Sequence, residues 1–248
     1  MTRYYCSGFD INNAFGHGLG DYFKKELRDT KSIVYIPAGT KSLEKARDKY
    51  IPIFTEHFKN VGIVFDEVNM ITPDLTKEQA KEMIKSASFI MLMGGDPFSE
   101  KKMCEDLDII DELKNYNGVM LGLSAGAMLM SKYIIITPCS EKYPNFHIGE
   151  GLNLDGISIY PHNNTSNKEY PDKLISGDEV YSKEDLIKVA REYGEFYLLQ
   201  DYQRDDELTD ISVIKSVNGN IEYYIENDGK IWIANDNIKL VNSNVKIK

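Results

Sequence analysis

The stretch "VMLGLSAGAML", residues 119–129, places a serine between small residues where one apolar run ends and another begins. Residues 118–124 predict a buried strand, and residues 125–132 predict the start of a helix. Residues 122–126 match the pattern Gly-x-Ser-x-Gly, which between a strand and a helix is typical of a nucleophile elbow. A small residue in an ordinary strand-to-helix turn is the alternative interpretation of Ser124, and the apolar context on both sides favours the elbow.

The same alternation of strand and helix extends through the first two thirds of the chain. Apolar runs predict strands at 32–39, 63–71, 89–95, 118–124 and 133–138. Amphipathic stretches predict helices at 42–62, with Pro52 inside it as a point of kinking, and at 72–87, 98–117 and 125–132. Strands separated by helices favour crossover connections. The expected fold class is therefore α/β, a doubly wound sandwich with a mostly parallel sheet.

The last third of the chain has a different pattern. After a predicted helix at 182–194, short strand-like runs occupy 196–200, 211–217, 221–226, 230–235 and 238–241. The pairs Asn218-Gly219 and Asp228-Gly229 are strong hairpin signals. We expect an antiparallel β-meander at the sheet edge. No linker separates it, so residues 1–248 are expected to form one domain with a strand-rich extension over about 195–248.

Composition excludes several classes of function. A net charge of −10 with few arginines argues against a nucleic-acid partner. The apolar runs are too short to cross a membrane, and the first residues lack a signal-peptide pattern, so a cytoplasmic enzyme without a membrane partner is expected. The three cysteines, Cys6, Cys104 and Cys139, are widely spaced and form no Cys/His cluster, so neither a metal nor another cofactor is expected. The sequence gives no indication of oligomeric state.

A nucleophilic serine needs a base, and the chain has four histidines. His162 follows the run "GISIYP" and stands where a strand is expected to end, at the edge where open α/β sheets place their sites. His147 is the competing candidate, in a loop without a strand-end pattern. His17 lies in a glycine-rich loop that could line a site, and His57 is expected to be a solvated residue in the middle of a helix.

An acyl-transfer site also needs an oxyanion hole. An elbow uses the backbone N–H that follows the nucleophile, here that of Ala125, together with one from another strand-end loop. The stretch "MLMGGDP" supplies that loop, because Gly94 and Gly95 follow a buried strand and lack side chains that would keep a ligand away. A simple helix-entry turn is the other interpretation, and both can hold together.

The ordered set "MGGDPF" (93–98), "GLSAGAM" (122–128) and "YPHNN" (160–164) resembles the S51 serine peptidases, the family of aspartyl dipeptidase (peptidase E) and cyanophycinase. The stretch "SIVYIPAGT" (32–40) also looks like a strand of that family. The resemblance covers about residues 30–165. It implies a class I glutamine amidotransferase-like α/β fold and a triad in the chain order serine, acid, histidine.

Carried over by position, the resemblance implies Ser124 as nucleophile and His162 as base, with Gly95 or Gly94 and Ala125 donating to the oxyanion. The acid must then lie between the serine and the histidine, where the carboxylates are Glu141, Glu150 and Asp155. Glu141 follows the predicted strand 133–138 and is favoured, because the cyanophycinase branch has a glutamate at this strand end. The other two lie in a glycine-rich stretch more typical of a turn.

Two departures from the family pattern bear on function. Asp96 stands where the family usually has asparagine, which adds a carboxylate beside the glycine pair. The arginine that aspartyl dipeptidases have shortly after the histidine is missing, and Lys168 and Lys173 are the cations there. Lysine cannot make the bidentate carboxylate contact of arginine, so specificity for N-terminal aspartate is not expected.

The expected function is a serine hydrolase that cleaves peptide bonds in small peptides through an acyl-enzyme on Ser124. The alternatives are a catalytically silent binding or regulatory relative with the same fold, and an esterase or amidase that acts on a non-peptide substrate. An intact acid beside the base separates the first possibility from the silent relative.

Overall fold

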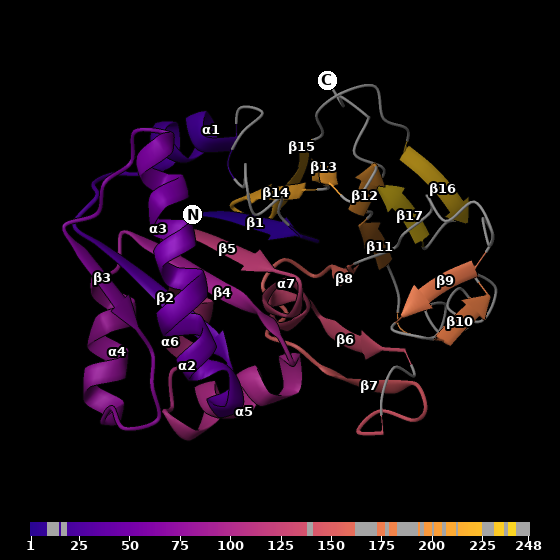
Figure 1. The fold of residues 1–248 in the computed structure, drawn as a ribbon, viewed down its shortest axis with the longest axis horizontal. Coiled ribbons are helices and arrows are strands. Elements are labelled where there is room, and N and C mark those ends of the chain that lie inside the picture. Colours follow the sequence, from indigo (N-terminus) through magenta and orange to yellow (C-terminus); the bar gives the residue numbers. More distant parts are fainter. Residues whose placement is uncertain are drawn as a thin grey trace.

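The computed structural model describes most of the first two thirds of the chain and the strands of the last third (Figure 1). The described residues are 1–8, 15, 19–137, 141–161, 173–176, 179–182, 193, 196–199, 201–204, 207–211, 213–224, 231–235 and 238–241.

The centre of the fold is a seven-stranded sheet in the order β15-β14-β1-β5-β4-β2-β3. Its strands are β1 (Thr2–Cys6), β2 (Ser32–Ala38), β3 (Glu67–Met70), β4 (Phe89–Gly95), β5 (Val119–Leu123), β14 (Val213–Val217) and β15 (Asn220–Tyr224). The pairings among β1, β5, β4, β2 and β3 are all parallel, whereas β14 is antiparallel to both β1 and β15. The predicted mostly parallel sheet is therefore confirmed, and the strands predicted at 32–39, 89–95 and 118–124 are all present.

Both faces of the sheet are covered by helices. Alternate residues of β2 belong to two different apolar clusters: Val34 and Ile36 to one, Ile33 and Tyr35 to the other. Helices α1 (Leu19–Glu26) and α3 (Ile51–Asn60) contribute to the cluster of Tyr35, whereas α4 (Lys77–Ser86), α5 (Pro97–Asp106), α6 (Ile110–Asn115) and α7 (Ala125–Met130) contribute to that of Val34. Period-two alternation between two buried faces is the reason why the strands have apolar residues at almost every position.

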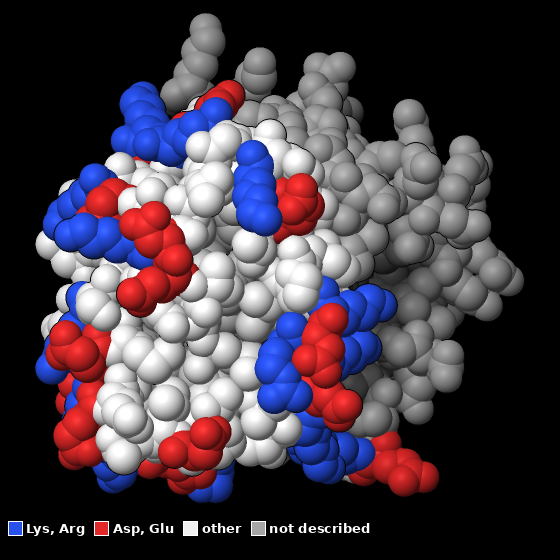
Figure 2. All heavy atoms as spheres, turned by 60° about the vertical axis from the view of Figure 1, so that its left-hand side comes forward, with Lys and Arg blue, Asp and Glu red and all other residues white. Residues whose placement is uncertain are grey.

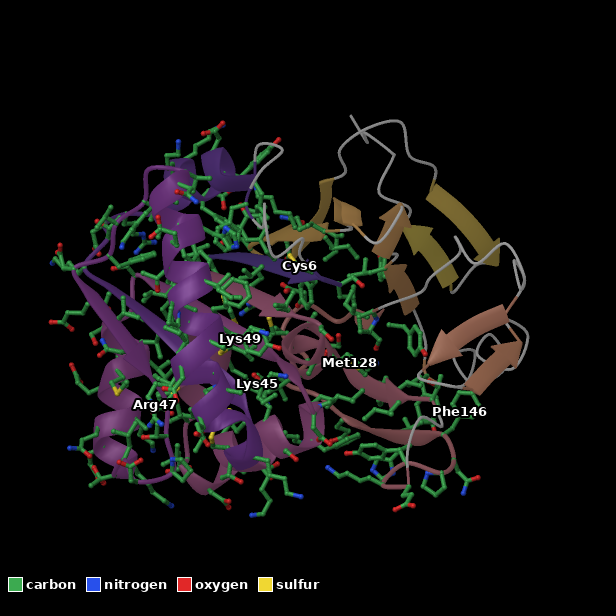
Figure 3. The ribbon with its side chains drawn as sticks, viewed as in Figure 1. Cys6, Lys45, Arg47, Lys49, Met128 and Phe146 are labelled. Atoms are coloured by element: carbon green, nitrogen blue, oxygen red, sulfur yellow. The ribbon has the colours of Figure 1, made fainter. Side chains whose placement is uncertain are left out.

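Two helix predictions were correct in place and wrong in detail. The predicted helix 42–62 consists of a 3-10 turn (Thr40–Ser42), α2 (Leu43–Lys45), a π-helical turn (Ala46–Tyr50) and α3. The π turn lies just before Pro52, which cannot donate the usual helical hydrogen bond; it carries Arg47 and Lys49, labelled in Figure 3. The predicted helix 98–117 is two helices, α5 and α6, because Asp108 between them has a φ of 56° and interrupts the helical backbone.

The remaining strands form separate small sheets. β6 (Tyr133–Ile136) pairs with β7 (His147–Glu150) in an antiparallel ladder outside the central sheet. A four-stranded sheet has the order β16-β17-β11-β8, and two further pairs are β9 with β10 and β12 with β13. The bounds are β8 (Ser158–Tyr160), β9 (Lys173–Ser176), β10 (Glu179–Ser182), β11 (Phe196–Leu199), β12 (Asp201–Arg204), β13 (Glu207–Ile211), β16 (Ile231–Asn235) and β17 (Ile238–Val241).

The last third is thus rich in strands, but the pairing differs from one continuous meander. Only the β14–β15 hairpin joins the central sheet, and β11 is parallel to both of its neighbours. Asn218 and Gly219 have φ values of 50° and 82°, the backbone that a two-residue Asn-Gly hairpin turn requires. Asp228-Gly229 lies outside the described residues, as does all of the predicted helix 182–194 apart from Ser182, the last residue of β10, and Tyr193.

The surface of the described part carries mixed charge. Figure 2 shows acidic and basic side chains interspersed around a large uncharged area on the face in view. Within the described ranges no helix combines the length and the apolar character needed to span a membrane.

Candidate active site

Ser124 has a strained backbone at the end of β5. It stands between β5 and α7 with φ 51° and ψ −106°, a conformation that side chains other than glycine rarely adopt. Its N–H donates to the carbonyl oxygen of Cys6 at 2.8 Å, and its own carbonyl oxygen accepts from the N–H of Met128 at 3.0 Å. Figure 3 labels these two partners on β1 and α7. The turn is therefore held from both sides, and the half-buried side chain of Ser124 lies at the carboxyl edge of the sheet.

The glycines of the motif are required by close packing. A Cβ on Gly126 would lie 2.3 Å from the carbonyl oxygen of Leu92, and one on Gly122 would lie 2.7 Å from the nitrogen of Ala127. Neither neighbouring backbone group can yield without moving β4 or α7. The Gly-x-Ser-x-Gly pattern therefore reflects the steric demand of a strand and a helix that pack tightly around a strained turn.

The glycine pair at the end of β4 lies beside the serine. A Cβ built on Gly94 would be 3.6 Å from the Cβ of Ser124, and β4 pairs with β5 in parallel register up to Leu92 and Gly122. Gly95 has a φ of 145°, and both glycines are exposed at the sheet edge. Ala125 is the first residue of α7 and is buried. The structure thus brings the predicted oxyanion residues to the same place as Ser124.

The structure describes two of the four histidines, His57 and His147. His162 and His17 lie outside the described residues. His147 is an exposed residue at the start of β7, with its ring 4.7 Å from that of Phe98 and 5.3 Å from that of Tyr143. His57 is only 8% exposed and packs near the ring of Phe54, so its prediction as a solvated residue was wrong. The apolar face of α3 packs against the sheet, and His57 is buried together with that face. The sequence around one polar residue does not indicate such burial.

Asp155, one of the three candidate acids, is fully engaged elsewhere. Its Oδ1 accepts from Arg3 Nη1 at 3.0 Å and from Ser216 Oγ at 2.8 Å, and its Oδ2 accepts from Tyr5 Oη at 2.5 Å. The side chains of Asp155 and Arg3 are 0% and 3% exposed. This buried network joins β1 and β14 to the segment after β7. Both oxygens of Asp155 therefore take part in this buried network.

Glu141 and Glu150 lie at opposite ends of the β6–β7 pair. Glu150 is paired with Tyr133, and the adjacent Gly151 packs against the carbonyl oxygen of Ser131, beyond the C-terminal end of α7. Glu141 is an exposed residue in the turn that precedes β7, and the next residues of that turn contact Asp96, directly after Gly95. The turn with Glu141 is thus connected to the end of β4 where Gly94 meets Ser124.

Asp96 is the centre of a polar cluster that the sequence did not reveal. Its Oδ1 accepts from the backbone N–H of Ser99 at 2.8 Å, which caps α5. Its Oδ2 accepts from Tyr143 Oη at 2.8 Å and from Lys142 Nζ in a short ion pair. Burial raises the pKa of Asp96, but these hydrogen bonds outweigh it and hold the pKa below its usual value. The N-cap was readable from the spacing of Asp96 and Ser99; the contacts with residues more than 40 positions away were not.

A groove of about 980 Å³ runs beside this cluster. It is lined by the end of β2, the segment before α4, α5 and the turn before β7; its lining residues include Thr40, Leu75, Phe98, Lys142 and His147. A smaller hollow of about 350 Å³ lies at the opposite edge, lined by Thr2 and Val119 at the amino ends of their strands. The larger groove contacts the polar cluster through Ser99, Lys142 and Tyr143, but its lining does not include Ser124 or the two glycines.

Among the described residues, no group of three or more histidine, cysteine or acidic side chains is placed to hold a metal ion. The site is therefore built from a strained serine, two exposed glycines and a charged cluster on the next turn. These groups are suited to nucleophilic attack on a carbonyl group and to stabilising the oxyanion that results.

The chain is similar to known proteins in sequence and in fold. The family model for "Peptidase family S51" matches residues 8–190. A crystal structure of a protein from Listeria monocytogenes EGD-e, named as a candidate peptidase E, is 18% identical, with a TM-score of 0.50, over 73% of this chain and 97% of that chain. A peptidase from an acI-B1 Actinobacterium is 16% identical, with a TM-score of 0.49, over 90% of this chain and 88% of that one. No curated protein matches by sequence. The family match spans well over half of the sequence, and the chain belongs to peptidase family S51.

Proposed function

We propose that this chain is a serine peptidase that cleaves small peptides through an acyl-enzyme on Ser124. The observation that carries the proposal is the strained backbone of Ser124, φ 51° and ψ −106°, with Gly94 beside it. Strain at a single serine persists only where the surrounding structure holds it, and such positions concentrate at active sites.

In the proposed reaction, Ser124 Oγ attacks the carbonyl carbon of the scissile peptide bond and gives its proton to His162. The backbone N–H groups of Ala125 and of Gly94 or Gly95 donate to the oxyanion of the tetrahedral intermediate. His162 returns the proton to the leaving amine as the C–N bond breaks. Water, deprotonated by the same histidine, then hydrolyses the ester on Ser124.

Glu141 is the proposed acid, which holds the histidine in the productive tautomer. Two observations support it over its competitors. Both oxygens of Asp155 already accept hydrogen bonds in a buried network, and Glu150 lies at the far end of the β6–β7 pair. The turn that carries Glu141, in contrast, contacts the residue after Gly95 through Lys142 and Tyr143.

The test is active-site labelling with a fluorophosphonate probe, followed by mapping of the modified residue. We expect wild-type protein to be modified at Ser124 and the Ser124→Ala variant to be unmodified. A folded wild-type protein that does not react would refute the proposal in favour of a silent relative. His162→Ala should lower the labelling rate by several orders of magnitude, whereas His147→Ala should not. The opposite result would move the base to His147.

Substrate class is tested with a library of dipeptides that vary in the first residue. We expect hydrolysis that depends on Ser124 and that shows no strong preference for N-terminal aspartate, because lysine replaces the expected arginine after His162. Hydrolysis of simple esters or of side-chain amides, with no cleavage of any dipeptide, would favour the esterase or amidase alternative.

A further inference from the structure

The position of Asp96 raises an electrostatic problem for the proposed site. Asp96 directly follows Gly94 and Gly95, so a carboxylate stands next to the groups that are proposed to stabilise an oxyanion. Its side chain is only 25% exposed, so water screens it incompletely. A nearby uncompensated negative charge opposes the formation of a second one, and it would slow the attack by Ser124.

The structure surrounds this carboxylate with donors from two elements. Lys142 forms an ion pair with Oδ2 of Asp96, Tyr143 donates to the same oxygen at 2.8 Å, and the N–H of Ser99 donates to Oδ1 at 2.8 Å. Hydrogen bonds to Asp96 and Tyr143 raise the pKa of Lys142, the contact with Asp96 being the larger cause. The two charges are therefore both present at neutral pH, as compensation requires.

The side chain of Lys142 is 58% exposed, but its ammonium group lies against the protein. It lies 3.4 Å from Ser99 Oγ and 4.9 Å from the centre of the Tyr143 ring, in addition to its contact with Asp96. Lys142 also comes directly after Glu141 in the same turn. Its contact with Asp96 therefore ties the turn of the proposed acid to the loop of the proposed oxyanion hole.

We propose that Lys142 is a positioning residue that acts through Asp96, by neutralising its charge beside the proposed oxyanion hole. This inference rests on the proposed function and adds a residue for which no role was expected. It has a specific corollary: Lys142 is needed only because residue 96 is an aspartate. An uncharged asparagine at that position would accept the cap hydrogen bond from Ser99 and leave no charge to compensate.

The test compares Lys142→Met, Asp96→Asn and the double variant by their kinetics of inactivation with a fluorophosphonate. We expect Lys142→Met to lower kinact tenfold or more, with KI within twofold of wild type, because the loss falls on the developing charge. Asp96→Asn is the reference for the double variant, because it removes the charge and keeps a side-chain oxygen that can accept from the N–H of Ser99. The double variant should return to within threefold of Asp96→Asn, and Lys142→Arg should retain the wild-type rate.

The matched control is Lys81→Met, which removes an ion pair of the same kind, 2.6 Å from Asp108 on the outside of the fold, and should leave kinact unchanged. Thermal unfolding of each variant separates this effect from loss of folding. A double variant as slow as Lys142→Met would overturn electrostatic compensation, and a wild-type kinact for Lys142→Met would overturn any role of this residue. Both results presuppose labelling of wild type at Ser124; absence of that labelling refutes the proposed function instead.

Discussion

A buried carboxyl group in α5 should make the stability of this protein depend on pH. Glu100 is 0% exposed, and neither of its carboxyl oxygens makes a hydrogen bond of good geometry with the described residues. Burial raises the pKa of Glu100 well above its usual value; the backbone of Met93 opposes this effect, and the negative charge of Asp96 adds to it. Glu100 is therefore protonated in the folded protein under conditions where it ionises in the unfolded chain.

The sign of the effect follows from where the proton is bound. Above the ordinary pKa of 4.5 the unfolded chain releases the proton of Glu100 and the folded protein keeps it. The free energy of unfolding therefore falls as the pH rises, by at most about 1.4 kcal/mol per pH unit while the folded group stays protonated. Between pH 5.5 and 7.5 this amounts to at most about 2.7 kcal/mol.

The perturbation is Glu100→Gln, which keeps the shape of the side chain and removes the titration. Urea unfolding at half-unit steps from pH 4.5 to 7.5 gives the free energy of unfolding of both proteins by linear extrapolation. We expect the free energy of unfolding of the variant to rise steadily relative to that of wild type as the pH rises. The buried amide adds only a difference that does not depend on pH. Glu105→Gln, on the same helix with its side chain 51% exposed, is the control and should give a pH profile parallel to wild type. Parallel profiles for wild type and Glu100→Gln would refute the reasoning.

Three further predictions test the packing around the serine. Gly126→Ala places a methyl group against the carbonyl oxygen of Leu92 and should lower the free energy of unfolding by about 1–3 kcal/mol, measured by urea unfolding, and slow fluorophosphonate labelling. Ser124→Gly should be more stable than Ser124→Ala by about 1–3 kcal/mol in the same assay, because glycine relieves the strained backbone; equal stabilities would contradict that strain. Asp155→Asn leaves Arg3 buried without its counter-charge and should cost about 3–5 kcal/mol, while the labelling rate of the folded protein stays unchanged; a collapse in that rate would make Asp155 the acid.

The strands β2, β4 and β5 of the central sheet were predictable because they are buried on both faces, whereas β1 was not among the predicted strands of the sheet. Continuous apolar runs such as 89–95 leave little choice of structure, and β4 begins and ends where the pattern does. The prediction at 63–71 was less accurate, because the edge strand β3 covers only Glu67–Met70 and two of its residues are exposed. An edge strand is decided by one neighbour, β2, and its own sequence carries a weaker pattern.

The spacing of apolar residues could not show whether a predicted helix is continuous or interrupted. Residues 98–117 keep helical spacing across the break, because both α5 and α6 pack the same apolar face on the sheet. The positive φ of Asp108 interrupts the helix, and it leaves the spacing of the apolar residues unchanged. In the last third, the β14–β15 hairpin at the sheet edge was predicted, whereas the strands β9, β10, β12 and β13 were not. The other pairings depend on contacts such as that of β11 with β8, which are distant in sequence.

In the candidate site too, features that depend on nearby residues were predictable, and features that depend on distant contacts were not. Ser124 and its glycines were predictable because strain and close packing act within a few residues and restrict the choice of amino acid there. The sequence favours Glu141 through its resemblance to the family and leaves Glu150 and Asp155 as alternatives in a glycine-rich stretch. β6 and β7 lie outside the central sheet, and the turn that carries Glu141 contacts Asp96 through Lys142 and Tyr143. The other end of the pair, with Glu150, contacts the end of α7 and also α5, where Lys101 Nζ donates to the carbonyl oxygen of Glu150 at 2.9 Å. Asp155 neutralises Arg3 inside the fold, and the turn that carries Glu141 contacts Asp96, the residue after the glycine pair, so Glu141 stays the proposed acid.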